Sequence, residues 1–97
     1  MADVIRMEYA AMEQLIAAFR MAHGALEDVK GVETQMVQLI ENGAMLGSAG
    51  EHLCSAIGGP LVNATLKLAA KMQEEAQDCM KAMEIMKQHD QEAAGRF

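Results

Sequence analysis

The sequence predicts an all-α fold, in which an antiparallel helix-turn-helix hairpin pairs with a second hairpin to form a dimeric four-helix bundle. Three observations lead to this prediction. Hydrophobic residues make up 52% of the chain while aromatic residues make up only 3%, a composition that favours helices over sheets. Apolar residues recur with helical periods in both halves of the chain, and the glycine-containing stretch from Gly43 to Leu53 separates the two halves. A chain of 97 residues is expected to form one small domain, 1–97.

The first helix is predicted over about residues 4–42, where apolar residues follow a seven-residue repeat. One column of this repeat is interrupted only by Glu33 and contains Ile5, Met12, Phe19, Leu26 and Ile40. The next column has Glu8 as its exception and contains Leu15, Ala22, Val29 and Met36. Further apolar residues widen the stripe on one flank: Tyr9, Ile16 and Val37. Both columns are therefore expected to form a coiled-coil-like seam.

A turn is predicted at residues 43–47. Asn42 and Gly43 tolerate the left-handed conformation that often ends a helix. Ser48 and Glu51 have the spacing of a capping box, in which Ser48 caps the next helix and Glu51 reaches back. Because the connection is short, the two helices are expected to lie antiparallel. A rival corner is the Gly58-Gly59-Pro60 stretch, which is otherwise expected to be a kink in the second helix.

The second helix is predicted over about residues 48–92, followed by a flexible tail at 93–97. Its apolar residues step by eleven in two columns, Ile57, Leu68 and Cys79, and Leu61, Met72 and Met83. A second apolar face contains Val62, Leu66, Ala69, Ala76 and Met80. A two-helix hairpin covers one seam on each helix, so the surplus on this arm predicts a partner hairpin. The residues expected at the dimer interface are Leu15, Phe19, Leu26, Leu61, Leu68, Met72, Met80 and Met83.

Several classes of function lack support in the sequence. The net charge is −6 and no basic stripe is present, so nucleic acid is not an expected partner. The chain shows no uninterrupted apolar run near the ~18 residues of a membrane span and no signal-peptide pattern, so stable membrane insertion is not expected. Cys54 and Cys79 lie too far apart on one helix for an intramolecular disulfide.

Catalytic and metal sites are likewise not expected. The three histidines, His23, His52 and His89, show no arrangement with a nucleophile and an acid, so they are read as solvated or partner-facing. The Met80, Met83 and Met86 spacing fits soft Cu(I) ligands, but packing explains it better. The carboxylates Glu74, Glu75, Asp78 and Glu84 are read as a solvated helix face. The prediction is a non-enzymatic protein with no cofactor and no metal.

The stretch Met45-Leu46-Gly47-Ser48-Ala49-Gly50-Glu51-His52-Leu53 resembles the turn of the early secreted antigenic target family, small helical-hairpin proteins named for a Trp-x-Gly turn. Met45 stands where that family has its tryptophan, so the likeness rests on Gly47, Glu51 and the architecture of the chain. The resemblance implies that the turn, with Met45, Gly47, Ser48 and Glu51, forms part of an export signal. The family's second signal element, Tyr-x-x-x-Asp/Glu, has its nearest match here at Met86 and Asp90.

The same resemblance implies how the protein acts. It implies a cytoplasmic protein that is exported as a folded homodimer or heterodimer by type VII secretion, without a signal peptide, to the medium or the cell surface. Equally, it implies an adaptor for a larger effector with a helical N-terminus, with the secretion ATPase as a further partner. The alternative reading of the residues is a cytosolic helical interaction or regulatory module unrelated to export.

Overall fold

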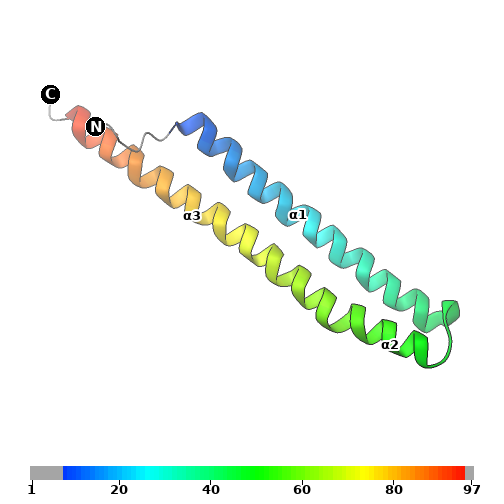
Figure 1. Cartoon of the computed structure of the whole chain (residues 1–97). Helices are drawn as coiled ribbons and strands as arrows, with labels where there is room; N and C mark the ends of the chain where they lie inside the picture. The colour runs from blue at the N-terminus through cyan, green and yellow to red at the C-terminus, as the bar shows by residue number, and fades with distance from the viewer. Residues whose placement is uncertain (1–7, 96–97) are drawn as a thin grey trace.

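The computed structural model describes residues 8–95, with side chains described up to Gln91, and these residues form an antiparallel helical hairpin (Figure 1). The first arm is α1 (Tyr9–Leu39), which continues into the π-helical turn η1 (Ile40–Ala44). The second arm contains α2 (Ser48–Ala56), the π-helical turn η2 (Ile57–Leu61) and α3 (Val62–Gly95). The molecule is a rod with extents of 75 × 19 × 15 Å. The predicted all-α helical hairpin is confirmed.

The start of α1 differs from the prediction. Glu8 is extended, with φ −88° and ψ 114°, and the helix begins at Tyr9. The predicted helical residues 4–7, Ile5 among them, lie outside the described residues, as do the last two of the predicted tail.

The face of α1 that packs on the second arm follows a seven-residue repeat, but with a different second column from the predicted one. Every buried or half-buried residue of this arm except Ala22 belongs to the repeat, which contains Tyr9, Met12, Ile16, Phe19, His23, Leu26, Lys30, Glu33, Val37 and Ile40. The predicted first column is part of this seam. The predicted second column is wrong, since Leu15, Val29 and Met36 are 44–46% exposed. The polar residues His23 and Lys30 interrupt the second column of the observed seam, so an apolar pattern alone does not reveal it.

The packed face of α3 is also a seven-residue repeat, containing Val62, Thr65, Ala69, Met72, Ala76, Cys79, Met83 and Met86. The predicted eleven-residue columns do not describe this seam, because Leu61 and Leu68 are 47% and 49% exposed. Two helices with heptad seams pack along their length as an antiparallel coiled coil.

The second arm stays continuous at the rival corner. Gly58, Gly59 and Pro60 lie within η2, and Val62 is helical with φ −61° and ψ −42°. Proline lacks an N–H group and its ring clashes with the carbonyl group one turn earlier, and a π-helical turn accommodates both defects. The chain therefore reverses at residues 43–47, and η2 connects α2 to α3 in one arm (Figure 1).

The core between the two arms is thin. Of the hydrophobic side chains described, only Ile16, Ala69 and Ala76 are buried, at 6%, 2% and 3% exposure. Two of these three residues are alanines, so little apolar area is removed from water. Most large apolar side chains of the hairpin therefore remain in contact with solvent.

One continuous helical stretch, Ser48–Gln91, meets the minimum length and composition for crossing a membrane. Its best 18-residue window has a mean hydropathy of 1.2, the threshold value. The sequence expectation concerned uninterrupted apolar runs, whereas this window averages apolar and polar residues. That the protein does not insert stably into a membrane remains a prediction.

Candidate functional site

The corner between the arms depends on two glycines in the left-handed region. Gly43 has φ 108° and ψ 7°, which ends the first arm. Met45 then returns to an extended conformation, and Gly47 has φ 85° and ψ −164°. Because L side chains rarely adopt such φ values, glycine is required at both positions.

The predicted capping box does not form. Ser48 is the first helical residue of α2 and Gly47 occupies the cap position; among residues 8–95, no side chain caps this helix. The backbone N–H of Glu51 instead donates to the carbonyl oxygen of Gly47, at 3.2 Å. The conformation of Gly47 leads the chain directly into the helix, so Ser48 lies one position too late to cap it.

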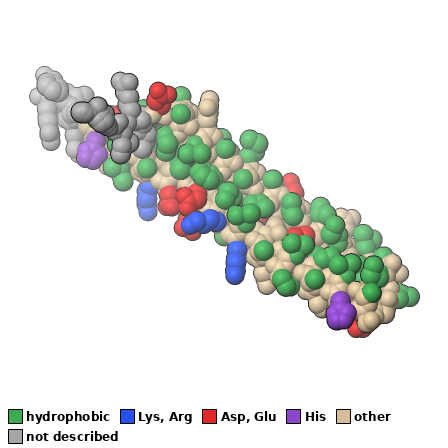
Figure 2. Space-filling model, viewed as in Figure 1, with side chains coloured by type: hydrophobic (Ala, Val, Ile, Leu, Met, Phe, Trp, Pro, Cys, Tyr) green, Lys and Arg blue, Asp and Glu red, His purple; other side chains and the backbone are tan. Residues whose placement is uncertain are grey.

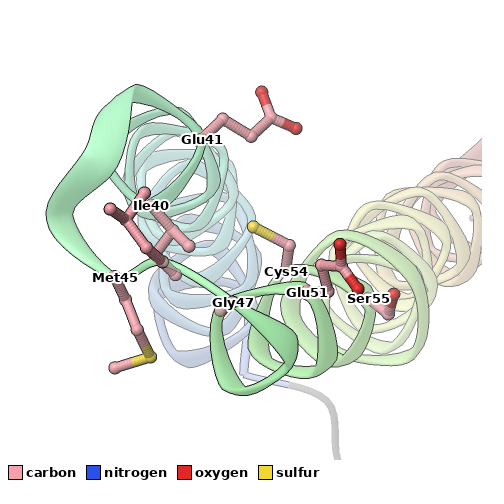
Figure 3. A pocket seen from close by; sticks show the side chains of 9 residues that line it. Ile40, Glu41, Met45, Gly47, Glu51, Cys54 and Ser55 are labelled. Atoms are coloured by element: carbon pink, nitrogen blue, oxygen red, sulfur yellow. The ribbon is translucent and has the colours of Figure 1, made fainter.

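An open cavity of about 390 Å³ lies at this end of the rod. Figure 3 shows Met45 and Ile40 on one side of it and Glu51 and Ser55 on the other, with Cys54 between the two arms. The Cys54 thiol contacts the carbonyl oxygen of Val37 at 3.8 Å. The lining residues are Ile40, Glu41, Met45, Leu46, Gly47, Gly50, Glu51, Cys54 and Ser55.

Three of the four predicted turn residues line this cavity. They are Met45, Gly47 and Glu51, while Ser48 is exposed and does not line it. Gly50, Cys54 and Ile40 also line the cavity and were not predicted as site residues. Gly50 had a usable signal, because a glycine in the first turn of a helix costs stability unless another group approaches closely. A cavity lined by both apolar and polar groups, two carboxylates among them, can hold an apolar or basic side chain of a partner.

A second apolar stripe runs the length of α1 beside the seam. We call it the α1 stripe; it contains Ala11, Leu15, Ala18, Ala22, Ala25, Val29, Val32, Met36 and Leu39. The spacing alternates between three and four residues, which places all nine on one face of the helix. Its large residues are 44–55% exposed. A stripe with no polar interruption, left open to solvent, is typical of a surface that packs on another helix.

The corresponding surface of α3 lies on the same side of the hairpin. Arg20 and Met80 contact each other on one side of the seam, with Nη2 2.9 Å from Sδ. In an antiparallel pair, the residues flanking the other side of each seam then face the same way. On α3 these residues form what we call the α3 face: Leu61, Ala64, Leu68, Lys71, Glu75, Asp78, Ala82 and Ile85.

Hydrophobic side chains gather toward the turn half of the rod on the face shown in Figure 2, while Lys and Arg lie along the edge formed by α3. This agrees with the residue exposures, because large exposed apolar residues of both arms lie in the turn half, among them Met36, Leu39, Leu46, Leu53 and Leu61. The surface available to a partner is therefore most apolar near the corner.

The eight predicted interface residues divide into two sets. Phe19, Leu26, Met72 and Met83 are half-buried in the seam between the arms of one chain. The other four are exposed at 36–49%: Leu15, Leu61, Leu68 and Met80. Of these four, Leu15 lies on the α1 stripe and Leu61 and Leu68 lie on the α3 face, whereas Met80 contacts Arg20 on the opposite side.

The predicted tail element is engaged within the chain at the open end of the hairpin. The Tyr9 hydroxyl donates a hydrogen bond to the Asp90 carboxylate. The Lys87 ammonium lies 5.5 Å from the centroid of the Tyr9 ring, within range of a cation–π interaction. Met86 is half-buried in the seam. The contacts of Tyr9 with Lys87 and Asp90 thus join the two arms at the open end of the hairpin.

The contact between Tyr9 and Asp90 predicts a loss of stability at alkaline pH. The hydrogen bond to Asp90, then desolvation and the Asp90 charge, raise the Tyr9 pKa above its ordinary 10.0. A raised pKa means that the contribution is fully present below pH 10.0 and is lost as pH rises through the folded-state value. At pH values below the folded-state pKa of Tyr9, we expect Tyr9→Phe to lower the melting temperature relative to the parent. Above that pKa, the melting temperatures of the two proteins should converge. Circular dichroism at a series of pH values measures both.

Lys71 titrates in the same range and needs its own control. Its pKa is raised by hydrogen bonds to Glu75 and Glu74 and by their charges. In a Lys71→Met background, the difference in melting temperature between the chain with Tyr9 and its Tyr9→Phe variant is therefore expected to stay the same. A Tyr9→Phe variant whose melting temperature falls with pH as steeply as that of the parent would contradict this assignment.

The remaining candidate groups in the described chain are a cluster of carboxylates, two thiols and a histidine in the seam. Carboxylate oxygens of Glu74, Glu75 and Asp78 lie within 4.8 Å of one another, and Lys71 reaches Glu74 and Glu75 at 3.4 and 3.3 Å. Neither described thiol is in a disulfide. His23 corrects the expectation of a solvated imidazole, because it is half-buried and its Nδ1 donates to the carbonyl oxygen of Ala69 at 2.8 Å.

Comparisons with protein-family models, with curated proteins and with solved structures found no match to this chain. The functional interpretation therefore depends on the geometry of the hairpin and on the residues described above.

Proposed function

We propose that this chain is a non-enzymatic helical-hairpin protein that pairs with another hairpin into a four-helix bundle. The observation that carries the proposal is the α1 stripe, nine apolar residues without a polar interruption, eight of which the chain's own second arm leaves exposed. Burying such a surface in a partner removes apolar area from water and adds the core that the isolated hairpin lacks.

In the cell, we propose that the paired hairpins act in type VII secretion, as a folded exported dimer or as an adaptor for a larger effector. The resemblance of Met45 to Leu53 to the Trp-x-Gly turn supports this role, together with the cavity that Met45, Gly47 and Glu51 line at the end of the rod. A cavity at the exposed end of a bundle stays accessible to a secretion ATPase after the stripes are buried.

A second candidate is a cytosolic interaction module without a link to export. One observation favours it: Asp90, the residue nearest to the family's tail signal, is engaged by Tyr9 of the same chain. An adaptor whose partner supplies the signal is compatible with the same contact.

The test follows the protein in the supernatant of its native host. We expect the chain to appear there with its N-terminus uncleaved. Placing a carboxylate among the apolar groups of the cavity, as in Met45→Asp, is expected to lower export by about tenfold or more. Helicity and association should not change. We choose Met45 rather than Gly47, because any side chain at φ 85° strains the turn itself.

Two further variants complete this experiment. Val32→Glu is expected to abolish association and export together, because Val32 is a large exposed residue of the α1 stripe. Gln35→Glu adds the same charge to an exposed position of α1 outside the stripe and should change neither. If the protein stays in the cells while other type VII substrates are exported, the exported-dimer role is wrong. If the export of those substrates also does not depend on this chain, the adaptor role is wrong as well and the cytosolic module is favoured.

A further inference from the structure

We propose that the partner of the α1 stripe is a second copy of this chain, docked antiparallel with the twofold axis beside Ala25. This inference rests on the proposed four-helix bundle and deepens it by naming the partner and its register. Three features support it: the order of side-chain sizes on α1, the charges on α3 and the level at which the two arms contact each other.

The α1 stripe has small residues in its first half and large residues in its second. Ala11, Ala18 and Ala22 come before Ala25, and the residues after it are Val29, Val32, Met36 and Leu39. In an antiparallel pair centred beside Ala25, each residue of the stripe lies opposite the one that is equally far beyond the centre, to within one residue. Leu39 then meets Ala11, Val32 meets Ala18, and Val29 meets Ala22. Only Leu15 and Met36 bring two large side chains together.

This arrangement lets large side chains fill the space beside small ones, as close packing requires. A parallel pair in which α1 packs on α1 places each residue against its own copy, so Val32 meets Val32 and Ala18 meets Ala18. The helices would then be held apart at one end and leave voids at the other. The size order on α1 therefore favours the antiparallel pair.

The contacts between the two arms show which residues of α3 lie level with this axis. Glu33 contacts Thr65, which places Ala25 level with residue 73, and Arg20 contacts Met80, which places it level with residue 75. A twofold axis beside Ala25 therefore crosses α3 near residues 73–75. The α3 face played no part in choosing this axis.

The α3 face carries charges of both signs about this level. Lys71 lies before it, and Glu75 and Asp78 lie at or after it, so an antiparallel second copy brings Lys71 of each chain toward the acidic residues of the other. Lys71 also bridges Glu74 and Glu75 in its own chain. Further out the α3 face is apolar on both sides of the axis, with Leu61, Ala64 and Leu68 before it and Ala82 and Ile85 after it.

Disulfide cross-linking of the full chain tests the register, in a background with Cys54→Ser and Cys79→Ser. We expect Ala25→Cys to form a covalent dimer on oxidation. Ala11→Cys alone should not, because its two copies lie about 42 Å apart at helical rise. Ala11→Cys mixed with Leu39→Cys should cross-link. Ala17→Cys, on the same helix but outside the α1 stripe, is the control and should remain uncross-linked.

A size exchange tests the pairing without cysteine chemistry. Ala18→Val and Val32→Ala are each expected to weaken dimerisation by about tenfold or more, through overpacking and a cavity respectively. The double variant should return to within about threefold of the parent, because the exchange restores the sum of volumes at each pair. The two positions lie about 21 Å apart within one helix, so they do not couple inside a monomer.

The outcomes separate this inference from the proposed function. Self-cross-linking of Ala11→Cys indicates a parallel dimer and overturns the register. A chain that is monomeric in light scattering but dimerises with a co-expressed second hairpin protein overturns the self-pairing and leaves the proposed function standing. A folded monomer under both conditions overturns both.

Discussion

Adding one methyl group at Gly50 is expected to lower the free energy of unfolding by about 2–3 kcal/mol. Gly50 is buried in the first turn of α2, against the chain that leaves the corner. A Cβ atom there would overlap the carbonyl oxygen of Met45 and lie 3.1 Å from its carbonyl carbon. Both are backbone atoms, so no side chain can rotate away. The turn must open to admit the methyl group.

Gly31→Ala is the matched control. Gly31 is exposed within α1, and no described atom lies within 4 Å of the Cβ position. This substitution is expected to stabilise the hairpin by about 0.5–1 kcal/mol, because alanine is the better helix former. Thermal and urea unfolding at one fixed protein concentration measure both changes. Equal effects of the two substitutions would show that the corner tolerates a Cβ atom at position 50.

The position of the corner was predictable because its signals are local. Asn42, Gly43 and Gly47 reveal their conformational preferences without reference to the rest of the chain. The closeness of Gly50 to the Met45 carbonyl was not predictable in the same way, since it depends on how the chain re-enters α2. For the same reason Ser48 was expected to cap a helix that Gly47 begins.

The seam was predicted only in part, because α1 has two apolar stripes side by side. Judged by hydrophobicity alone, the α1 stripe is the better candidate for the seam. For this reason the sequence predicts that the column with Leu15 and Val29 lies in the seam. The true column contains His23 and Lys30. His23 is accommodated because it donates to the carbonyl oxygen of Ala69 on the opposite arm, a partner that α1 itself does not reveal.

The chain folds back on the stripe that contains polar residues and leaves the uninterrupted apolar stripe exposed. A protein that acted as an isolated hairpin would gain stability from the opposite choice. This arrangement supports the proposal that another molecule packs on the α1 stripe.

Replacing Glu33 by leucine is expected to stabilise the hairpin by about 1–3 kcal/mol. Glu33 lies in the seam and is only 4% exposed. Its Oε2 accepts a hydrogen bond from Thr65 Oγ1 at 3.1 Å, while Oε1 is buried without a hydrogen-bond partner among the described residues. Thr65 Oγ1 also lies 3.0 Å from the carbonyl oxygen of Leu61. One hydroxyl proton therefore serves two acceptors, and the carboxylate is poorly compensated for its burial.

The reverse perturbation is Thr65→Val, which keeps the shape of the side chain and removes the only donor to the carboxylate in the described chain. We expect it to cost about 1–3 kcal/mol in the parent, because both Glu33 oxygens are then buried without partners. In the Glu33→Leu background the same change should cost little, so the two substitutions are strongly non-additive. Urea unfolding of the four variants at one protein concentration measures this coupling. Additive effects, or a loss of stability in Glu33→Leu, would mean that the Glu33–Thr65 contact holds the two arms together rather than straining them.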